Sequence, residues 1–154
     1  MTKAMRITRA QIEDAQEILT LQKLAYQSEA AIVNDYTIPP LTQTLEEITA
    51  QFVDHVFVKG IIDSRIIGSA RAYQDQGTCF IGRVIVHPDF QNQGLGSQIL
   101  QAIENEFPDA KQFELFTGSK SERNLHFYQK LGYRIFKKEA LNENVELVFL
   151  ERLQ

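Results

Sequence analysis

A β-branched strand that runs through a glycine-containing loop into a helix constrains this chain more than any other feature. The strand spans residues 78–87, Pro88 stops it, and apolar residues then recur at helical spacing over residues 94–107. Gly94 and Gly96 lack side chains, so a ligand can approach backbone N–H groups where unpaired donors and the helix dipole favour an anion. The segment therefore predicts a phosphate or pyrophosphate site, unless the glycines only allow the helix to pack closely on the strand.

Two phosphate-binding motifs are absent from this loop. No Lys-Ser or Lys-Thr pair follows the glycines, so the loop is not a P-loop. Ile99 stands where the third glycine of the dinucleotide-binding fingerprint belongs. Kinase and dehydrogenase functions are disfavoured on both grounds.

The length and charge of the chain exclude further classes of protein. With 154 residues, 44% of them hydrophobic and 23% charged, the chain is typical of one globular domain, expected to span residues 1–154. The formal net charge is −4, whereas a nucleic-acid-binding face needs an excess of Lys and Arg. We therefore expect no nucleic acid among its partners.

Cysteine, histidine and hydropathy patterns narrow the chemistry and the location. Cys79 is the only cysteine, which excludes an intrachain disulfide, and the three histidines lack metal-binding spacing, so no metal is expected. No apolar run approaches the ~18 residues of a membrane span, and the first ten residues lack the apolar core of a secretory signal. These patterns predict a cytoplasmic protein that does not act at a membrane.

The rest of the sequence alternates between strand and helix patterns. Pro39 and Pro40 are expected to break the helical pattern between the first two helices. The order of elements predicts an α/β (α+β) domain, a mixed sheet of six to seven strands with about four helices on both faces. Strands are predicted over residues 5–8, 56–62, 66–73, 78–87, 112–117, 133–138 and 145–150, and helices over residues 11–28, 45–52, 94–107 and 121–131.

Two blocks of sequence together resemble the GNAT family of N-acetyltransferases. Gln91-x-x-Gly94-x-Gly96, after a Val-x-Val-x-Pro strand, resembles the family's acetyl-CoA signature. The run from Asn124 to Tyr133, which contains Tyr-Gln-Lys-Leu-Gly-Tyr, resembles its C-terminal helix and turn. A helix and a strand separate the blocks as in the family, and the order of elements matches over essentially the whole chain. The resemblance implies a GNAT-like, mostly antiparallel sheet and acetyl-CoA as co-substrate.

The resemblance also implies roles for individual residues. The backbone of Val84 and Val86 would pair with the pantetheine arm as a neighbouring strand does. Tyr128 would lie near the thioester sulfur and act as general acid for the departing CoA thiolate, after direct attack by a neutral amine. The pyrophosphate would lie against the loop that contains Gln91 and against the backbone amides of Asn92, Gln93, Gly94, Leu95, Gly96 and Ser97.

Two positions depart from the family's pattern. Many members have a glutamate, the general base, four residues before the first pantetheine-pairing residue, and here Phe80 stands there. Glu114, expected on the adjacent strand, is a candidate replacement for this base. The alternatives are another residue, an ordered water or a backbone carbonyl. Members also often have an asparagine that touches CoA seven residues before the tyrosine. Ser121 takes that position, which fits a helix N-cap or a cofactor contact, and Asn124 is a further candidate contact.

Two residues outside these motifs are candidates for the acceptor pocket. Tyr36 follows the first helix, in a region that shapes the acceptor pocket in related enzymes, and otherwise it packs its own loop. Arg83 lies within an apolar strand, on the face opposite Val84 and Val86. It either contacts an acidic part of the acceptor or forms a salt bridge with a nearby helix. The acidic net charge suits cationic amines, either small molecules such as polyamines or lysine side chains of a protein, without deciding among them.

The predicted function is acetyl transfer from acetyl-CoA to a primary amine. Tyr128 favours catalysis, because a tyrosine with an ordinary pKa of about 10 is protonated at neutral pH and can donate its proton. Phe80 in place of a glutamate favours the alternative, a non-catalytic acyl-CoA-binding or sensing module. A different acyl donor stays open, and a homodimer is possible.

Overall fold

The computed structural model describes residues 4–154; residues 1–3, which belong to the predicted domain and to the segment considered as a signal, lie outside it. The strands are β1 (Arg6–Arg9), β2 (Val56–Ile62), β3 (Arg65–Asp75), β4 (Thr78–Val86), β5 (Gln112–Gly118), β6 (Arg134–Ala140) and β7 (Glu146–Leu153). The α-helices are α1 (Ala15–Ala25), α2 (Gln27–Val33), α3 (Pro39–Thr42), α4 (Leu45–Gln51), α5 (Leu95–Asn105) and α6 (Glu122–Lys130). Two 3₁₀ turns, η1 (Ile12–Asp14) and η2 (Pro88–Phe90), precede α1 and α5.

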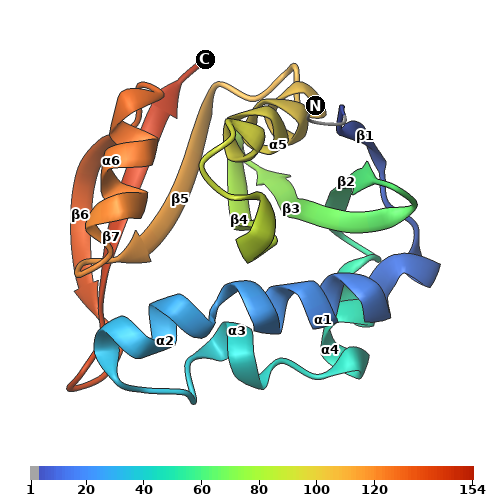
Figure 1. Ribbon diagram of the computed structural model, residues 1–154. Helices are drawn as coiled ribbons and strands as arrows, with labels where there is room; N and C mark the ends of the chain where they lie inside the picture. Colours follow the sequence, from blue (N-terminus) through green and yellow to red (C-terminus); the bar gives the residue numbers. More distant parts are fainter. Residues whose placement is uncertain (1–3) are drawn as a thin grey trace.

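Within the described residues the strands form one seven-stranded sheet in the order β1-β2-β3-β4-β5-β7-β6 (Figure 1). Only β4 and β5 run parallel, and every other neighbouring pair is antiparallel. The predicted fold class, a mixed and mostly antiparallel sheet of six to seven strands, is confirmed.

The parallel pair at the centre of the sheet separates soon after it begins. β4 and β5 pair only from Thr78 with Gln112 to Phe80 with Glu114. Beyond Phe80, β4 pairs with β3 alone, and Figure 1 shows β5 leaning away from it toward α6. The second half of β4 therefore has one edge without a neighbouring strand.

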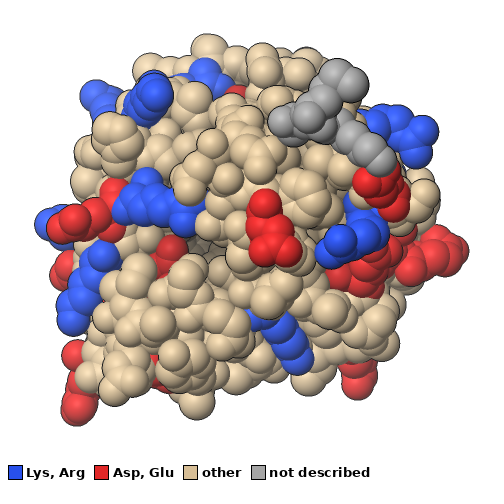
Figure 2. Space-filling model, viewed as in Figure 1, with Lys and Arg blue, Asp and Glu red and all other residues tan. Residues whose placement is uncertain are grey.

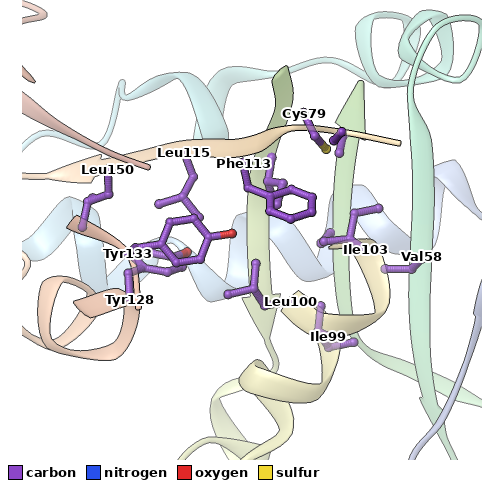
Figure 3. Packing of buried hydrophobic residues seen from close by; sticks show 14 of the residues in the cluster. Val58, Cys79, Ile99, Leu100, Ile103, Phe113, Leu115, Tyr128, Tyr133 and Leu150 are labelled. Carbon is purple, nitrogen blue, oxygen red and sulfur yellow. The ribbon is translucent and has the colours of Figure 1, made fainter. Parts of the chain in front are cut away.

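Helices cover both faces of the sheet, as predicted. On one face, Ile99, Leu100 and Ile103 of α5 pack with Phe113 of β5 and Tyr128 of α6 (Figure 3). On the other face, apolar side chains of α1 and α4 pack against β2, β3 and β4, and the buried members of this second core are Ala10, Ala15, Ile18, Leu19, Leu21, Ile48, Phe57, Ile66 and Ile85. The helical spacing of the apolar residues in α1 and α5 accounts for these two contacts.

The region between β1 and β2 differs from its prediction. The helix expected over residues 11–28 is divided at Tyr26, and α2 continues to Val33, where Asn34 ends it in the left-handed conformation with φ 51°. Pro39 and Pro40 do not merely interrupt a helix; they begin α3. The first positions of a helix tolerate proline because their N–H groups have no intrahelical partner. Residues 4–154 therefore contain six α-helices, two more than predicted.

Candidate active site

The loop between β4 and α5 presents backbone N–H groups, as the glycine pattern predicted. Asn92 and Gly94 adopt left-handed φ values of 64° and 78°, and α5 begins directly after Gly94. No side chain caps this end of α5, and its first turn contains no acidic residue. The first N–H groups of this 11-residue helix are thus open to an anion, which the helix dipole also favours.

Side chains fix this loop against β4 and α6. Gln91 donates from Nε2 to the Val86 carbonyl oxygen at 3.1 Å and accepts from Arg123 Nη1 at 2.7 Å. Ser97 Oγ donates to the carbonyl oxygen of Gly94 at 2.9 Å. Arg123 adds a positive charge beside the loop, which the sequence analysis missed because it stands 32 residues from Gln91. Cofactor binding by Val84, Val86 and the loop residues stays a prediction.

The two glycines of the loop differ in what requires them. A Cβ on Gly94 would meet no atom within 4 Å, so only its φ of 78° requires glycine. A Cβ on Gly96 would lie 3.3 Å from Phe127 Cζ of α6. Close packing, the alternative interpretation of the glycine pattern, thus applies to Gly96 but not to Gly94.

Tyr128 lies on α6, on the same face of the sheet as α5. It is 7% exposed, and its ring packs edge-on against Phe127. It also packs edge-on against Tyr133 (Figure 3). Burial, with the nearby Tyr26 and Glu29, raises the pKa of Tyr128 well above its ordinary value. Its hydroxyl donates to none of the described residues, so a protonated donor is available at neutral pH.

The two further candidate contacts of α6 are both bound to one carboxylate. Ser121 is the N-cap residue of α6, but its side chain makes no capping hydrogen bond. Its Oγ donates to Oε1 of Glu29 at 2.9 Å, and Asn124 Nδ2 donates to the same oxygen at 3.0 Å and to Thr117 Oγ1 at 3.2 Å. The N-cap position of Ser121 is therefore as expected, whereas the capping bond is not, because Glu29 of α2 takes the hydroxyl.

A cavity of about 350 Å³ opens on the α1 face of the sheet, where β4 and β5 separate. Phe80 and Glu114, the last paired residues, both line it, and the Phe80 ring stacks on Tyr73 with centroids 5.1 Å apart. Burial raises the pKa of Glu114, while Lys137 opposes the shift. The full lining is Gln51, His55, Arg71, Tyr73, Phe80, Ile81, Gly82, Arg83, Glu114, Leu115, Phe116 and Phe149.

The two candidates for the acceptor pocket lie in different places. Arg83 lines the cavity, with its Cζ atom 5.9 Å from the ring centre of Tyr26. No described carboxylate pairs with Arg83, so the alternative of a salt bridge to a nearby helix is wrong; the residue beside Arg83 is Tyr26, at the break between α1 and α2. Tyr36, in contrast, is 53% exposed on the turn before α3 and does not line the cavity.

Other groups contribute less to the site. Cys79 is fully buried in β4, where burial raises the pKa of its thiol to about 12, so it is protonated at neutral pH and unsuited to nucleophilic attack. Residues 4–154 contain no cluster of His, Cys, Asp and Glu arranged to hold a metal ion. In the same part of the chain, no helix combines the length and apolar character that a membrane crossing requires. Figure 2 shows basic and acidic side chains interspersed over the face in view.

Comparison with known proteins agrees with this arrangement. The Acetyltransferase (GNAT) family matches residues 15–133, which contain the loop, Tyr128 and every residue that lines the cavity except Phe149. The chain therefore belongs to the GNAT acetyltransferase family, a family of acyltransferases, which confirms the resemblance of the two sequence blocks.

Curated relatives share parts of the chain. UPF0157 protein YqkA of Bacillus subtilis is 28% identical over 120 residues, which are 78% of this chain and 34% of that protein. The uncharacterized N-acetyltransferase ycf52 of Porphyra purpurea is 34% identical over 71 residues, or 46% of this chain and 40% of that protein. The chain thus spans little more than a third of the length of these relatives.

Solved structures share the whole fold at low sequence identity. The PaiA N-acetyltransferase of Thermoplasma acidophilum, solved in complex with coenzyme A, superposes with a TM-score of 0.81 at 16% identity, covering 99% of this chain and all of that one. The ribosomal-protein-S18-alanine N-acetyltransferase of Escherichia coli gives a TM-score of 0.77 at 12% identity, covering 97% and 94%. At these identities the likeness concerns the fold.

Proposed function

We propose that this protein transfers the acetyl group of acetyl-CoA directly to a primary amine, and that the two substrates meet where β4 and β5 separate. The observation that carries the proposal is that the separation of β4 and β5 has a candidate cofactor site on one face of the sheet and a cavity on the other. The open N-terminus of α5 and Tyr128 lie on one face of the sheet, and the cavity lined by Glu114 lies on the other. Family membership and the coenzyme A bound to the structural neighbour PaiA support acetyl-CoA as the donor.

The cofactor side would use mostly backbone groups. The unpaired edge of β4 after Phe80 leaves the backbone at Val84 and Val86 free of β5, as pairing with a pantetheine arm requires. The N–H groups from Asn92 to Ser97 would bind the pyrophosphate, with Arg123 as a nearby positive charge. Ser121 and Asn124 would act only indirectly, because both already bind Glu29.

In the reaction, the amine nitrogen would attack the thioester carbonyl carbon, and the bond from carbon to sulfur would break. The proton lost by the amine would go to the Glu114 carboxylate, and the departing thiolate would take the Tyr128 hydroxyl proton. Glu114 suits the first role because burial raises its pKa toward neutral pH, which makes it a stronger base than an ordinary carboxylate. Tyr128 suits the second role because its hydroxyl is protonated and has no described acceptor.

The alternative function is a non-catalytic acyl-CoA-binding module, favoured by Phe80 at the family's usual base position. An assay for free thiol with acetyl-CoA and a broad amine panel, with the acetylated amine identified by mass, separates the two functions. Acetyl transfer predicts thiol and acetylated amine in equal amounts. Binding of CoA without thiol release from any amine would favour the alternative. A homodimer stays a prediction.

A further inference from the structure

Two arginine side chains line the cavity where β4 and β5 separate, which is the proposed acceptor site. Neither of them has a carboxylate partner among the described residues. Arg71 projects from β3 and Arg83 from β4, and each has a buried Nε atom with no hydrogen-bond partner. The pairing of β3 with β4 shifts register between Ser69 and Arg71, and Arg83 itself has φ 53°. This bulge inserts one extra residue into β4 and directs Arg83 toward the α1 face.

The groups that contact the Arg71 guanidinium are uncharged. Its Nη2 donates to Gln22 Oε1, and its Nη1 donates to Gln51 Oε1 at 2.6 Å and to Gln43 Oε1 at 3.2 Å. Its Cζ lies 4.8 Å from the ring centre of Phe57, and the residue is 4% exposed. Burial and the charge of Arg83 lower the pKa of Arg71 to about 9, which leaves it charged at neutral pH. Three amides and a ring thus hold a cation for which residues 4–154 supply no anion.

Elsewhere the protein pairs its half-buried cations with carboxylates. Lys59, on the neighbouring strand β2, lies 2.8 Å from Asp14, and Arg152 lies 2.8 Å from Glu104. Desolvating a charge without a counterion is costly, and two neighbouring guanidinium groups repel each other besides. Arg71 and Arg83 in the cavity therefore differ from these pairs in having no carboxylate partner within the described part of the chain. A bound anion would offset the cost of desolvation and the repulsion between the two guanidinium groups.

The rest of the cavity complements a small molecule with two charged ends. Its volume of about 350 Å³ lies at the lower end of the range for ligand sites. Tyr73, Phe80 and Phe149 supply apolar walls, and Glu114 supplies a carboxylate that forms no ion pair with either arginine. Glu114 can receive the ammonium group of an amine whose anionic group is bound by the two arginines.

We propose that the acceptor is a small primary amine that carries an anionic group, bound by Arg71 and Arg83. This inference rests on the proposed acetyl transfer for its activity readout. It reverses the expectation from net charge, which suited cationic amines, because the charge of the cavity differs from that of the whole surface. A carboxylate and a phosphate both match a guanidinium fork, so the anion itself is left to the test.

The first test compares amines that differ only in charge. We expect 4-aminobutyrate, or 2-aminoethyl phosphate if the anion is a phosphate, to be acetylated with a kcat/KM roughly 10- to 100-fold above butylamine or ethylamine, the usual value of a charged hydrogen bond. 1,4-Diaminobutane should be the poorest acceptor. Equal or higher kcat/KM for the neutral or cationic amines, or for a peptide amine without an acidic group, would overturn the inference.

The second test places a carboxylate beside Arg71 inside the protein. Gln51→Glu is nearly isosteric and should pair with Arg71, so kcat/KM for the anionic amine should fall roughly 10- to 100-fold while CoA affinity is unchanged. Gln101→Glu, an exposed change of the same charge on α5, is the matched control and should leave both values unchanged. Arg83→Gln should lower kcat/KM for the anionic amine more than for butylamine. If both cavity variants acetylate the anionic amine like the wild type, the inference is wrong.

A binding measurement separates failure of this inference from failure of acetyl transfer. Calorimetry of the CoA-loaded wild-type protein with 4-aminobutyrate, 2-aminoethyl phosphate and butylamine needs no turnover. The anion site is supported, even if no amine is acetylated, when the wild type binds an anionic amine but not butylamine and the Gln51→Glu variant no longer binds the anionic amine. Acetylation of butylamine with no binding of either anionic amine supports the proposed function and contradicts the anion site.

Discussion

The two sides of the β4–β5 separation differ in what builds them. The cofactor side is a contiguous segment, with left-handed φ values at Asn92 and Gly94, whose backbone N–H groups would bind the pyrophosphate. The acceptor side is assembled from side chains of α4, β3, β4, β5 and β7. A backbone site keeps one ligand through many changes of side chain, whereas a side-chain cavity changes its ligand with a few substitutions. Acceptor choice should therefore respond to charge, and cofactor binding to backbone conformation.

The largest effect is expected at Tyr128, on the cofactor side. Tyr128→Phe removes one hydroxyl and keeps the ring, so kcat should fall roughly 10²- to 10⁴-fold if the hydroxyl protonates the thiolate. The affinity for CoA should change far less, because the hydroxyl matters chiefly as charge develops on sulfur. Steady-state thiol release and CoA binding measure the two quantities. Equal losses of both would mark Tyr128 as a cofactor contact instead.

Tyr133 supplies a matched control for this substitution. Its ring lies 6.0 Å from that of Tyr128, and its hydroxyl donates to Glu104 Oε2 at 2.6 Å. Tyr133→Phe should therefore lower the free energy of unfolding by about 1–2 kcal/mol and leave kcat unchanged. A loss of kcat at Tyr133 as large as that at Tyr128 would show that packing, not proton donation, explains both.

The next largest effect is expected at Glu114. Glu114→Gln should lower kcat roughly 100-fold if its carboxylate is the base. A base must be ionised, and burial raises the pKa of Glu114, so wild-type kcat should rise with pH above the ordinary glutamate range. The variant should lack that rise, and the exposed Glu143→Gln should keep it. Identical pH profiles for Glu114→Gln and wild type would exclude Glu114 and direct attention to His55, the other ionisable base that lines the cavity.

A smaller effect on CoA affinity is expected at Gly94. Gly94→Val forces a β-branched residue into φ 78°, which costs about 1–2 kcal/mol, so the affinity for CoA should fall roughly tenfold as the loop rearranges. Gly94→Asn is the matched variant, since asparagine tolerates this conformation, and it should lose less. Calorimetry on folded protein measures both. An unchanged affinity in Gly94→Val would refute the pyrophosphate assignment.

Gly96 sharpens the same comparison through stability. Gly96→Ala brings a Cβ to 3.3 Å from Phe127, so α5 and α6 must move apart slightly and the free energy of unfolding should fall by about 1 kcal/mol. Gly96→Ala combined with Phe127→Leu should recover part of that loss. Denaturant unfolding of the single and double variants decides whether packing requires this glycine. A Gly96→Ala variant as stable as the wild type would contradict that requirement.

The smallest effect is the stability of Glu114→Gln as a function of pH. Because the pKa of Glu114 is raised in the folded state, folding favours the protonated form. Its contribution to stability is present below the unfolded pKa of about 4.3 and is lost as pH rises through the folded value. Glu114→Gln should therefore unfold at higher denaturant than wild type at pH 7, with the difference disappearing at acidic pH. A difference that grows on acidification would contradict the raised pKa.

The two sides also differ in how much of each could be predicted from the sequence. The loop, α5 and Tyr128 lie in two contiguous blocks with fixed spacing, so they were located correctly without the structure. Glu114 and Phe80 could be placed together because adjacent strands bring them into register. The prediction that the Ser121 side chain caps its helix was wrong. Its hydroxyl bonds instead to Glu29, which is 92 residues away in the sequence and could not be identified as its partner from the sequence.

Arg71 and Tyr26 were missed for the same reason. Their neighbours come from other elements: Gln22, Gln43 and Gln51 around Arg71, and Arg83 beside Tyr26. A signal did exist in the sequence, since Arg71 interrupts the run of small and apolar residues in β3 at a position that faces the core. An arginine inside an otherwise apolar strand needs a partner, and only the fold shows that none of the described residues supplies a charged one.

A crystal structure with acetyl-CoA tests the central claim most directly. The account predicts pyrophosphate oxygens within about 2.7–3.2 Å of the N–H groups at the start of α5, and pantetheine paired with β4 at Val84 and Val86. It also predicts the thioester sulfur within hydrogen-bond reach of the Tyr128 hydroxyl, with the acetyl group directed toward the cavity of Arg71, Arg83 and Glu114. Acetyl-CoA bound elsewhere, or a thioester turned away from Tyr128 and the cavity, would contradict it.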